Sequence, residues 1–447
     1  MELCILNRLL THASFLMTEF TPAATPPAHQ PLPAAPAPTP ATPASAATAA
    51  AQLAPRLLAQ AAATDTIGGF PAQEMTWLRE AGLLTAALPP SLGGAGLGEP
   101  AAALALLQAL YHIGRGNLAV GRLWEGHVNA LLLIRCFGTP AQLARAAADA
   151  RAGHVFGVWN TENPAEGVHL EPQAAAPGRY RLRGAKTFAS GSGHITRPVL
   201  TGMLTAPAAS APRRDQGPVV PRVPAPTPPP TGWQLVLLRA DEQPPVLDRS
   251  FWRPLGMRST ASFRADFTGL GIGTDDLVGQ PNDYYRAPWF GGGAARFAAV
   301  QLGGAAAVLD ETRRFLRRLG RTDDPYQRQR LGEMLLLHET GQRWLRGAAE
   351  HAALPPTLAE TLPPARLEAL AAYVNALRTT TEDICLQTLR LAERSVGARG
   401  LLQPEPFERL HRDLTHYLRQ PAPDAAQADI GRFALASDKP AYQLWQG

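Results

Sequence analysis

Hydrophobic and polar positions divide the chain into three long blocks. In residues 51–153 apolar side chains recur every three to four positions, which predicts a domain of amphipathic and buried helices. In residues 154–283 the period shortens toward two and apolar runs alternate with turn residues, which predicts strands. In residues 284–433 the helical period returns, with small residues spaced so that helices can pack closely. Segregated blocks of this kind predict an α+β fold and not a doubly wound sheet.

Three segments lie outside these patterns. Residues 1–50 are rich in proline and alanine and are expected to be disordered, because they offer little apolar surface to bury. Residues 205–232 form a proline-rich insert in the strand block, and we expect an exposed loop there. Residues 434–447 are expected to form a tail. The segment Met1–Met17 lacks the features of a signal peptide, so Met17 is an alternative start of the chain.

Composition narrows the classes of partner. The 447 residues carry a net charge of +5, and Lys186 and Lys439 are the chain's two lysines. A preference for arginine over lysine more often reflects the base composition of the genome than nucleic-acid binding. Because the sequence also shows no basic groove or recognition motif, we expect no nucleic-acid partner. The three cysteines are scattered, which argues against disulfides and a metal site and favours a reducing cytoplasm. No run reaches the about 20 apolar residues of a membrane span.

The stretch from Phe156 to Ser192 is the strongest candidate for chemistry. It reads FGVWNTENPAEGVHLEP and, after a spacer, YRLRGAKTFASGSG, which predicts paired strands. These strands would bring the candidate cofactor residues Trp159, Thr161, Phe188 and Ser190 to one wall. Aromatic and hydroxyl side chains suit a flat heterocycle with polar edges, so the pattern favours a flavin. The alternative is that the hydroxyls are ordinary strand residues and the phenylalanine belongs to the core.

The order and spacing of five motifs resemble those of the acyl-CoA dehydrogenase superfamily over residues 51–420. The motifs are WLREAGLLTAALPPSLGGAGLG, WNTENPAEG, LRGAKTFASGSG, WRPLGMRSTASFRADFTGLGIGTDDLVG, and VGARGLL followed by PFERLHRDL. The resemblance implies an N-terminal helical domain, a central β domain and a C-terminal four-helix bundle. It also implies FAD as cofactor, and a homodimer or homotetramer in which neighbouring subunits share each flavin site.

Residue roles follow from the resemblance by position. Thr161 would bond the pyrimidine edge of the isoalloxazine ring, and Phe188 would replace the family's tryptophan against that ring. Ser190 would replace the threonine at flavin N5, where a hydroxyl donor steadies the charge that develops on reduction.

The resemblance also implies that residues of the helical block at 284–433 bind the adenine–pyrophosphate half of the cofactor. Arg318 or Arg321 lies near the family's pyrophosphate arginine, although a solvated basic face also explains this arginine-rich helix. Gly397 and Gly400 would let backbone N–H groups approach phosphate without a Cβ in the way. A helix C-cap at Gly397 is the alternative.

The sequence departs from the family at the catalytic base. Acyl thioester oxidation needs a carboxylate to remove the α-proton, but Pro421 occupies the usual glutamate position and Ala295 the alternative one. Asp424 is the nearest later carboxylate and a weak candidate. Monooxygenases of the superfamily often carry a histidine in this region, and His416 is a better candidate than His411.

Three hypotheses therefore remain. The favoured one is an FAD-dependent oxidoreductase that acts on the CH–CH group of an acyl thioester of CoA or a carrier protein, with hydride transfer to flavin N5. The second is a monooxygenase or oxidase that uses reduced flavin and oxygen, with an electron-transfer or flavin-reductase partner. The third is a degenerate homologue with a scaffold role. A carboxylate at the flavin would favour the first hypothesis, and a histidine would favour the second.

Overall fold

The structure, a computed structural model, describes residues 41–204, 231–286, 289–352 and 362–445. Its N-terminal helices are α1 (Pro43–Gln60), α2 (Ala72–Glu80), α3 (Ala103–Gly116), α4 (Leu118–Phe137) and α5 (Pro140–Ala152). Residues 1–40, and with them most of the segment expected to be disordered, lie outside the described residues.

Helix α1 begins earlier than the hydrophobic pattern suggests. Thr42 and Ser45 form a capping box at its N-terminus, and a proline stands in the first turn. Ala46 and Ala50 are fully buried. The expectation of disorder is therefore wrong for residues 43–50. The buried face of this part of the helix is made of alanines, and alanine is too weakly hydrophobic to show a clear helical period in the sequence.

The central region contains two sheets. Its strands are β1 (Phe156–Trp159), β2 (His169–Pro172), β3 (Arg179–Arg183), β4 (Ala185–Ala189), β5 (Arg197–Leu204), β6 (Gly232–Leu237), β7 (Val246–Asp248), β8 (Phe263–Asp266), β9 (Gly271–Gly273) and β10 (Leu277–Val278). The larger sheet has the order β10-β6-β5-β2-β3-β9, with β1 paired parallel to β5. The smaller sheet has the order β4-β8-β7. The insert at 205–230 lies outside the described residues.

The two halves of the Phe156–Ser192 stretch pair as expected, but through β2 and β3, which run antiparallel, and not through the strands next to the candidate residues. Strand β1 lies in the larger sheet and β4 in the smaller one, so they are not ladder partners. They meet instead at their ends, where the Thr187 N–H donates to the Thr161 carbonyl at 2.8 Å. The two sheets are thus joined at the place where the candidate residues were expected to gather.

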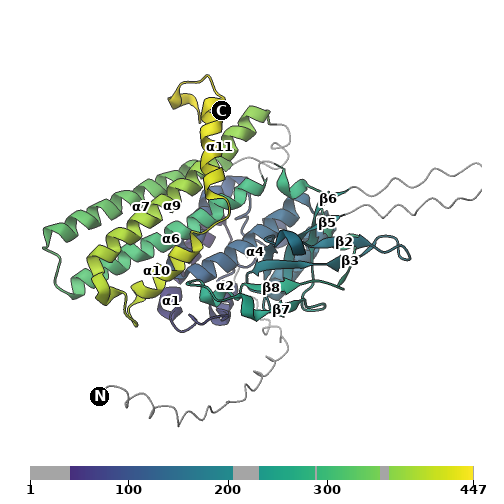
Figure 1. Cartoon of the computed structure of the whole chain (residues 1–447), viewed down its shortest axis with the longest axis horizontal. Coiled ribbons are helices and arrows are strands. Elements are labelled where there is room, and N and C mark those ends of the chain that lie inside the picture. The colour runs from purple at the N-terminus through teal and green to yellow at the C-terminus, as the bar shows by residue number, and fades with distance from the viewer. Residues whose placement is uncertain (1–40, 205–230, 287–288, 353–361, 446–447) are drawn as a thin grey trace, which may run out of the picture. The chain divides into compact units, whose positions relative to one another are not determined.

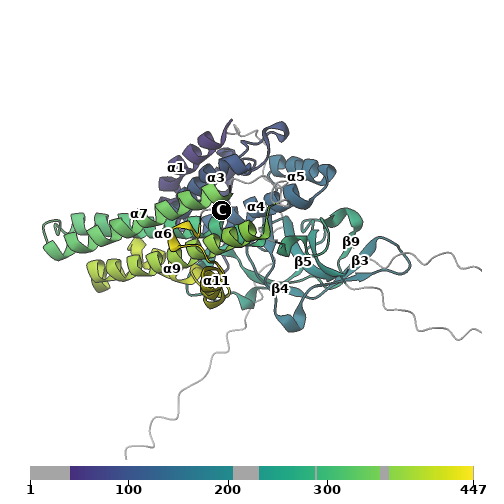
Figure 2. The same ribbon diagram turned by 90° about the horizontal axis from the view of Figure 1, so that it is seen from above.

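The C-terminal region is a bundle of long helices. They are α6 (Trp289–Arg318), α7 (Pro325–Ala352), α9 (Pro364–Gly400), α10 (Pro406–Tyr417) and α11 (Pro423–Leu435). Figures 1 and 2 show α6, α7 and α9 side by side, and α4 lies between this bundle and the strands. Helix α4 therefore contacts both α6 and β1. No helix in the described ranges is long and apolar enough to cross a bilayer.

Small residues bring α3 and α6 close together. A Cβ on Gly303 of α6 would lie 2.1 Å from the Tyr111 carbonyl oxygen, and one on Gly114 of α3 would lie 2.3 Å from that of Val300. Neither position accepts a side chain without moving a backbone, so the small-residue spacing in α6 fixes this interface.

Candidate active site

An exposed aromatic side chain marks the end of β4. Phe188 has φ +52° and is 48% exposed, which is unusual for a large non-glycine residue. Its ring meets Phe251 and Trp252 edge to face, with centroids 5.1 and 6.2 Å apart. A strained backbone that presents an aromatic face to solvent is typical of a ligand clamp. We call Phe188, Phe251 and Trp252 the aromatic wall.

A chain of hydroxyl groups lies beside this wall. The Ser262 hydroxyl donates to Ser190 Oγ at 2.9 Å, and Thr260 Oγ1 lies 2.7 Å from Ser262 Oγ. The proton of Ser190 itself has one weak acceptor among the described residues, the Phe188 carbonyl at 3.5 Å. Ser190 is therefore ready to donate to a ligand, as a residue at flavin N5 would be.

Trp159 and Thr161 support the same place from β1. The Trp159 indole donates to the Ser190 carbonyl at 2.9 Å, and its side chain is 1% exposed. Trp159 therefore holds the Ser190 turn from behind and does not line the surface. Thr161 is exposed at the strand end. The structure thus places Thr161, Phe188 and Ser190 close together, whereas the expectation that Trp159 lines the same wall is wrong, because its side chain is buried behind the Ser190 turn.

A buried ion pair holds the Thr161 segment. Lys186 is fully buried and bonds the Glu162 carboxylate and, at 3.1 Å, Thr201 Oγ1. Burial lowers the pKa of Lys186, and the bond and charge of Glu162 oppose that shift. Asn160 bonds Thr201 and accepts from the Tyr285 hydroxyl at 3.2 Å. The two sides of Thr161 are thereby fixed to β4 and β5.

His416 reaches the aromatic wall from α10. Its ring meets that of Trp252 edge to face with centroids 5.5 Å apart. Burial lowers the pKa of His416 from the ordinary 6.5, so the imidazole is neutral near pH 7. His411, on the same helix, instead bonds Glu393. The two histidines therefore face different surroundings.

Asp413 anchors α10 to the β domain. Its carboxylate is 3% exposed and accepts from the Met257 N–H at 2.6 Å. Met257 has φ +57° and begins the turn that carries Thr260 and Ser262. The bond therefore positions both His416 and the hydroxyl chain, which agrees with a structural role for Asp413.

The positions where a carboxylate base was sought are not acidic. Ala295 is buried in α6, and Pro421 is exposed between α10 and α11. Asp424 is exposed in the first turn of α11, which packs against α9. The structure does not bring Asp424 to the aromatic wall.

The pyrophosphate candidates lie far along the bundle. The Tyr417 carbonyl accepts from Gln301 of α6 at 2.9 Å, and Arg318 is 17 residues further on, about 25 Å at 1.5 Å per residue. Arg318 is bound by both Glu405 oxygens at 2.7 and 2.8 Å, and Arg321 pairs with Asp324 at 2.9 Å.

The two candidate glycines have different surroundings. Gly397 has φ +61° in a kink of α9, and a Cβ there would meet nothing within 4 Å. Gly400 is buried, and its Cβ would meet Val396 at 2.3 Å. Gly397 therefore leaves the backbone open to a ligand, and Gly400 serves packing.

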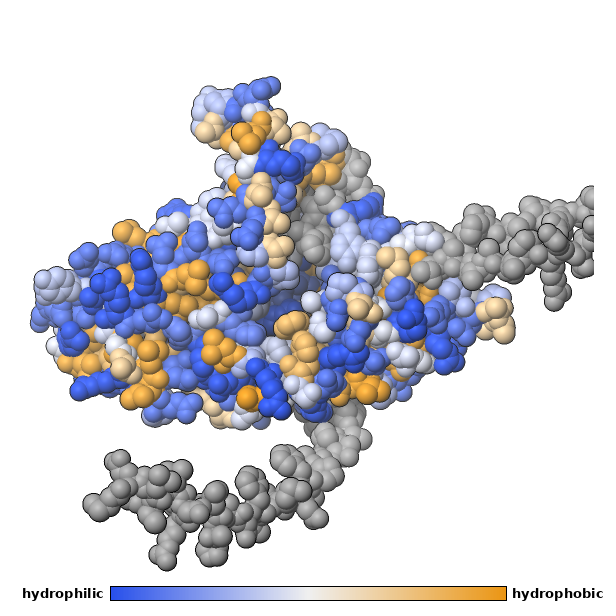
Figure 3. All heavy atoms as spheres, viewed as in Figure 1, coloured by the Kyte–Doolittle hydropathy of each residue, from blue (hydrophilic) through white to orange (hydrophobic). Residues whose placement is uncertain are grey.

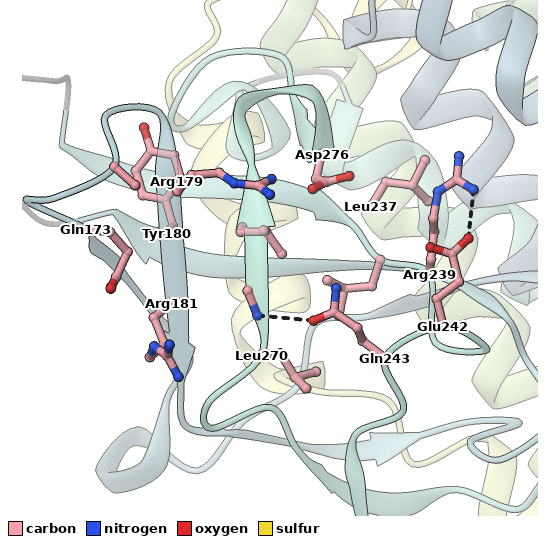
Figure 4. A pocket seen from close by; sticks show the side chains of 14 residues that line it. Gln173, Arg179, Tyr180, Arg181, Leu237, Arg239, Glu242, Gln243, Leu270 and Asp276 are labelled. Atoms are coloured by element: carbon pink, nitrogen blue, oxygen red, sulfur yellow. Dashed lines mark hydrogen bonds and ion pairs between the residues drawn. The ribbon is translucent and has the colours of Figure 1, made fainter.

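A separate cavity of about 510 Å³ lies on β3, β6 and β9 (Figure 4). Arg239 pairs there with Glu242, and Gln243 accepts from the Gly271 N–H at 3.2 Å. None of the candidate flavin residues lines it. The aromatic wall, where those residues lie, is therefore the better candidate site.

Sequence reasoning missed Trp252, Phe251 and Ser262 as members of the site. They follow β7 or open β8, some 60 residues or more after Phe188. The WRPLGMRSTASF motif that contains two of them was the available signal. It identified the family but gave these side chains no role.

Replacing Ser190 with alanine tests the hydroxyl assignment. We expect flavin to bind about five-fold more weakly, since one hydrogen bond contributes about 1 kcal/mol, and the visible spectrum of bound flavin to shift. Ser192→Ala is the control, because the Ser192 hydroxyl bonds the Ala261 carbonyl at 3.1 Å in the protein interior. Unchanged affinity and spectrum in Ser190→Ala would exclude contact between Ser190 and the ring.

Comparisons with known proteins identify the family of the chain. The family model "Acyl-CoA dehydrogenase, N-terminal domain" matches residues 41–153, and "Acyl-CoA dehydrogenase, C-terminal domain" matches residues 295–418. A dibenzothiophene monooxygenase from Rhodococcus erythropolis is 25% identical over 410 residues, which are 87% of this chain and 92% of the relative.

Solved structures show the same fold. The dibenzothiophene monooxygenase of Paenibacillus sp. A11-2, in complex with FMN and indole, has a TM-score of 0.72 at 21% identity, covering 90% of this chain and 100% of that one. Butyryl-CoA dehydrogenase from Megasphaera elsdenii has a TM-score of 0.70 at 16% identity, covering 88% and 98%. Both ends of the chain match the same family, and the chain therefore belongs to the flavin-binding acyl-CoA dehydrogenase superfamily.

Proposed function

We propose that this protein is a flavin-dependent monooxygenase of the cytoplasm that uses reduced flavin, supplied by a separate reductase, to place one atom of dioxygen on a small organic substrate. The observation that carries the proposal is His416, which meets the aromatic wall in a family whose dehydrogenases need a carboxylate base. The dibenzothiophene monooxygenases among the relatives support the same choice over dehydrogenation.

The residues of the chain have distinct roles in this reaction. Reduced flavin supplies the two electrons by which dioxygen yields an oxygenated product and water. Phe188 covers the ring and excludes water from it, and Trp252, which is 4% exposed, supports Phe188 from behind. Ser190 donates a hydrogen bond toward the ring edge, and the neutral His416 imidazole accepts or returns a proton beside the wall.

Thioester dehydrogenation is the alternative, and Glu125 is the carboxylate that would favour it. Glu125 is 3% exposed on α4. One of its oxygens accepts from Arg122 at 2.6 Å and the other accepts from Asn129. A carboxylate with both oxygens bound in this way is a counter-ion and not a free base, so dehydrogenation ranks second.

For the cofactor we propose FMN in place of the expected FAD. The arginines that would bind a pyrophosphate, Arg318 and Arg321, are already paired with Glu405 and Asp324. FMN in the Paenibacillus enzyme supports this choice.

The proposal is tested by supplying the protein with a flavin reductase, NADH, either FMN or FAD, and isotopically labelled dioxygen. Indole and dibenzothiophene serve as probes because the relatives bind or oxidise them. Incorporation of one labelled oxygen atom into a probe supports the proposal. Anaerobic bleaching of the bound flavin by an acyl-CoA thioester would instead establish a dehydrogenase.

We also propose a homodimer or homotetramer. The family resemblance supports this state, because it implies that neighbouring subunits share each flavin site. Exposed apolar side chains on α7 support an interface: Tyr326, Leu335 and Leu336 are 69%, 60% and 72% exposed. Figure 3 shows hydrophobic residues at the surface on the bundle side.

Size-exclusion chromatography with light scattering at micromolar concentration is expected to show an oligomer. Replacing Leu335 and Leu336 together with serine should shift the protein toward monomer and lower its flavin affinity, because the shared site is lost. Leu435→Ser, 90% exposed on α11, is the matched control. A monomer that retains flavin would disprove the shared site.

A further inference from the structure

The hydroxyl chain beside the aromatic wall runs inward from the candidate flavin site to a backbone carbonyl. Ser190 at its outer end is half-buried, whereas Ser262 and Thr260 are 2% and 1% exposed. The hydroxyl oxygens of Ser190 and Ser262 are 2.9 Å apart, and those of Ser262 and Thr260 are 2.7 Å apart. The Thr260 hydroxyl also lies 2.9 Å from the Met257 carbonyl oxygen. Four oxygen atoms therefore form one continuous series of hydrogen bonds.

The backbone holds these oxygen atoms in place. The Gly191 N–H donates to the Thr260 carbonyl at 2.7 Å, which ties the Ser190 turn to the turn before β8. The Trp159 indole donates to the Ser190 carbonyl at 2.9 Å. The Met257 N–H is bound by Asp413 of α10 at 2.6 Å. The hydroxyl groups can therefore change the direction of their protons while the oxygen positions stay the same.

Counting protons shows that the hydroxyl chain has two self-consistent arrangements. Each hydroxyl has one proton and two lone pairs, and the carbonyl at the inner end can only accept. In the outward arrangement Thr260 donates to Ser262, Ser262 donates to Ser190, and the Ser190 proton points into the site. In the inward arrangement every bond is reversed, Thr260 donates to the Met257 carbonyl, and Ser190 presents a lone pair to the site. Any other arrangement leaves a short contact without a proton or a buried proton without an acceptor.

A flavin needs both arrangements at N5. In oxidised flavin this nitrogen has a lone pair and accepts a hydrogen bond, whereas in reduced flavin it carries a hydrogen and donates one. The outward arrangement fits the oxidised ring, and the inward arrangement fits the reduced ring. A hydroxyl without an internal acceptor for its proton would serve the oxidised ring alone.

We infer that Ser262 and Thr260 are positioning residues that let Ser190 donate to N5 of the oxidised flavin and accept from N5–H of the reduced flavin. The reversal moves no proton from one oxygen to another, because each hydroxyl only rotates about its own C–O bond. Without Ser262, the Ser190 proton would have one internal acceptor among the described residues, the Phe188 carbonyl at 3.5 Å. The inference rests on the proposed flavin site, with Ser190 at N5.

Replacing Ser262 with alanine tests the inference through the affinities of the two forms of flavin. Oxidised FMN and dithionite-reduced FMN are titrated separately into the protein without oxygen, and the ratio of the two dissociation constants is compared with that of the parent. We expect the reduced form to lose about five-fold more affinity than the oxidised form, since one hydrogen bond contributes about 1 kcal/mol. Ser192→Ala is the control, because Ser192 bonds the Ala261 carbonyl in the same turn but lies outside the hydroxyl chain. Loosening the turn would weaken both forms alike and leave the ratio unchanged.

A pair of variants at Thr260 keeps the inference testable if Ser262→Ala does not fold. Thr260→Val preserves the shape of the side chain but removes the inner acceptor of Ser262, so the same ratio should change by about five-fold. Thr260→Ser retains the hydroxyl and should keep the ratio of the parent protein.

The inference is overturned if Ser262→Ala and Thr260→Val keep the parent ratio within about two-fold, the usual scale of a neutral change. It is also overturned if Ser192→Ala changes the ratio as much, if Thr260→Ser does not retain it, or if the protein binds no flavin. These titrations need neither oxygen nor substrate. Failure of the proposed oxygenation would therefore be seen separately, as the expected ratios without labelled product.

Discussion

Replacing His416 with phenylalanine is expected to lower oxygen insertion about 100-fold or more, the usual contribution of a positioned acid–base group. The ring of the new side chain would keep the edge contact with Trp252, so flavin affinity and the spectrum of bound flavin should remain those of the parent protein. The measurement is the rate of labelled-oxygen incorporation into the best-oxidised probe, together with a flavin titration of the same preparation.

His411→Phe is the matched control, because His411 lies on the same helix and bonds Glu393 away from the wall. It should leave the rate within about two-fold, as expected of a surface change. A His416→Phe variant as active as His411→Phe would remove His416 from the mechanism. Because burial lowers the pKa of His416 below 6.5, the neutral form persists into mild acid. A step that needs this base should therefore be constant from pH 7 to 8 and decline below pH 6.5.

The helical and strand blocks could be predicted because burial imposes a period on each element. The α1 boundary could not, since Ala46 and Ala50 pack a helix interface without a strong hydrophobic signal. The pairing of β1 with β5 was also missed. Neighbouring strands in sequence usually pair, as β2 and β3 do, but β1 pairs with β5 across three intervening strands, and nothing local in the sequence encodes that choice.

The candidate site was predictable to the extent that its residues lie in one stretch. Thr161, Phe188 and Ser190 fall within a short segment with a recognisable motif, and the structure brings them together. Trp252 and His416 join them through contacts between distant elements.

Replacing Lys186 with methionine is expected to destabilise the protein by about 3–5 kcal/mol, the usual result of removing one partner of a buried ion pair. Methionine preserves most of the aliphatic stem but leaves Glu162, 16% exposed, and Thr201 without the ammonium that bonds them. The loop that carries Thr161 is held by the same bonds, so flavin should also bind more weakly. Denaturant unfolding followed by tryptophan fluorescence measures the first effect, and flavin titration measures the second.

Arg183→Met separates this effect from the general loss of a positive charge. Arg183 pairs with Glu171 at 2.8 Å on the neighbouring strands, but the two side chains are 60% and 46% exposed. Water screens such a pair, so its loss should cost less than about 1 kcal/mol. The double variant Lys186→Met with Glu162→Gln should recover part of the stability, because it removes the stranded charge. If Lys186→Met and Arg183→Met destabilise the protein equally, the buried pair does not hold the flavin loop, and Thr161 must be positioned by its bond to Thr187 alone.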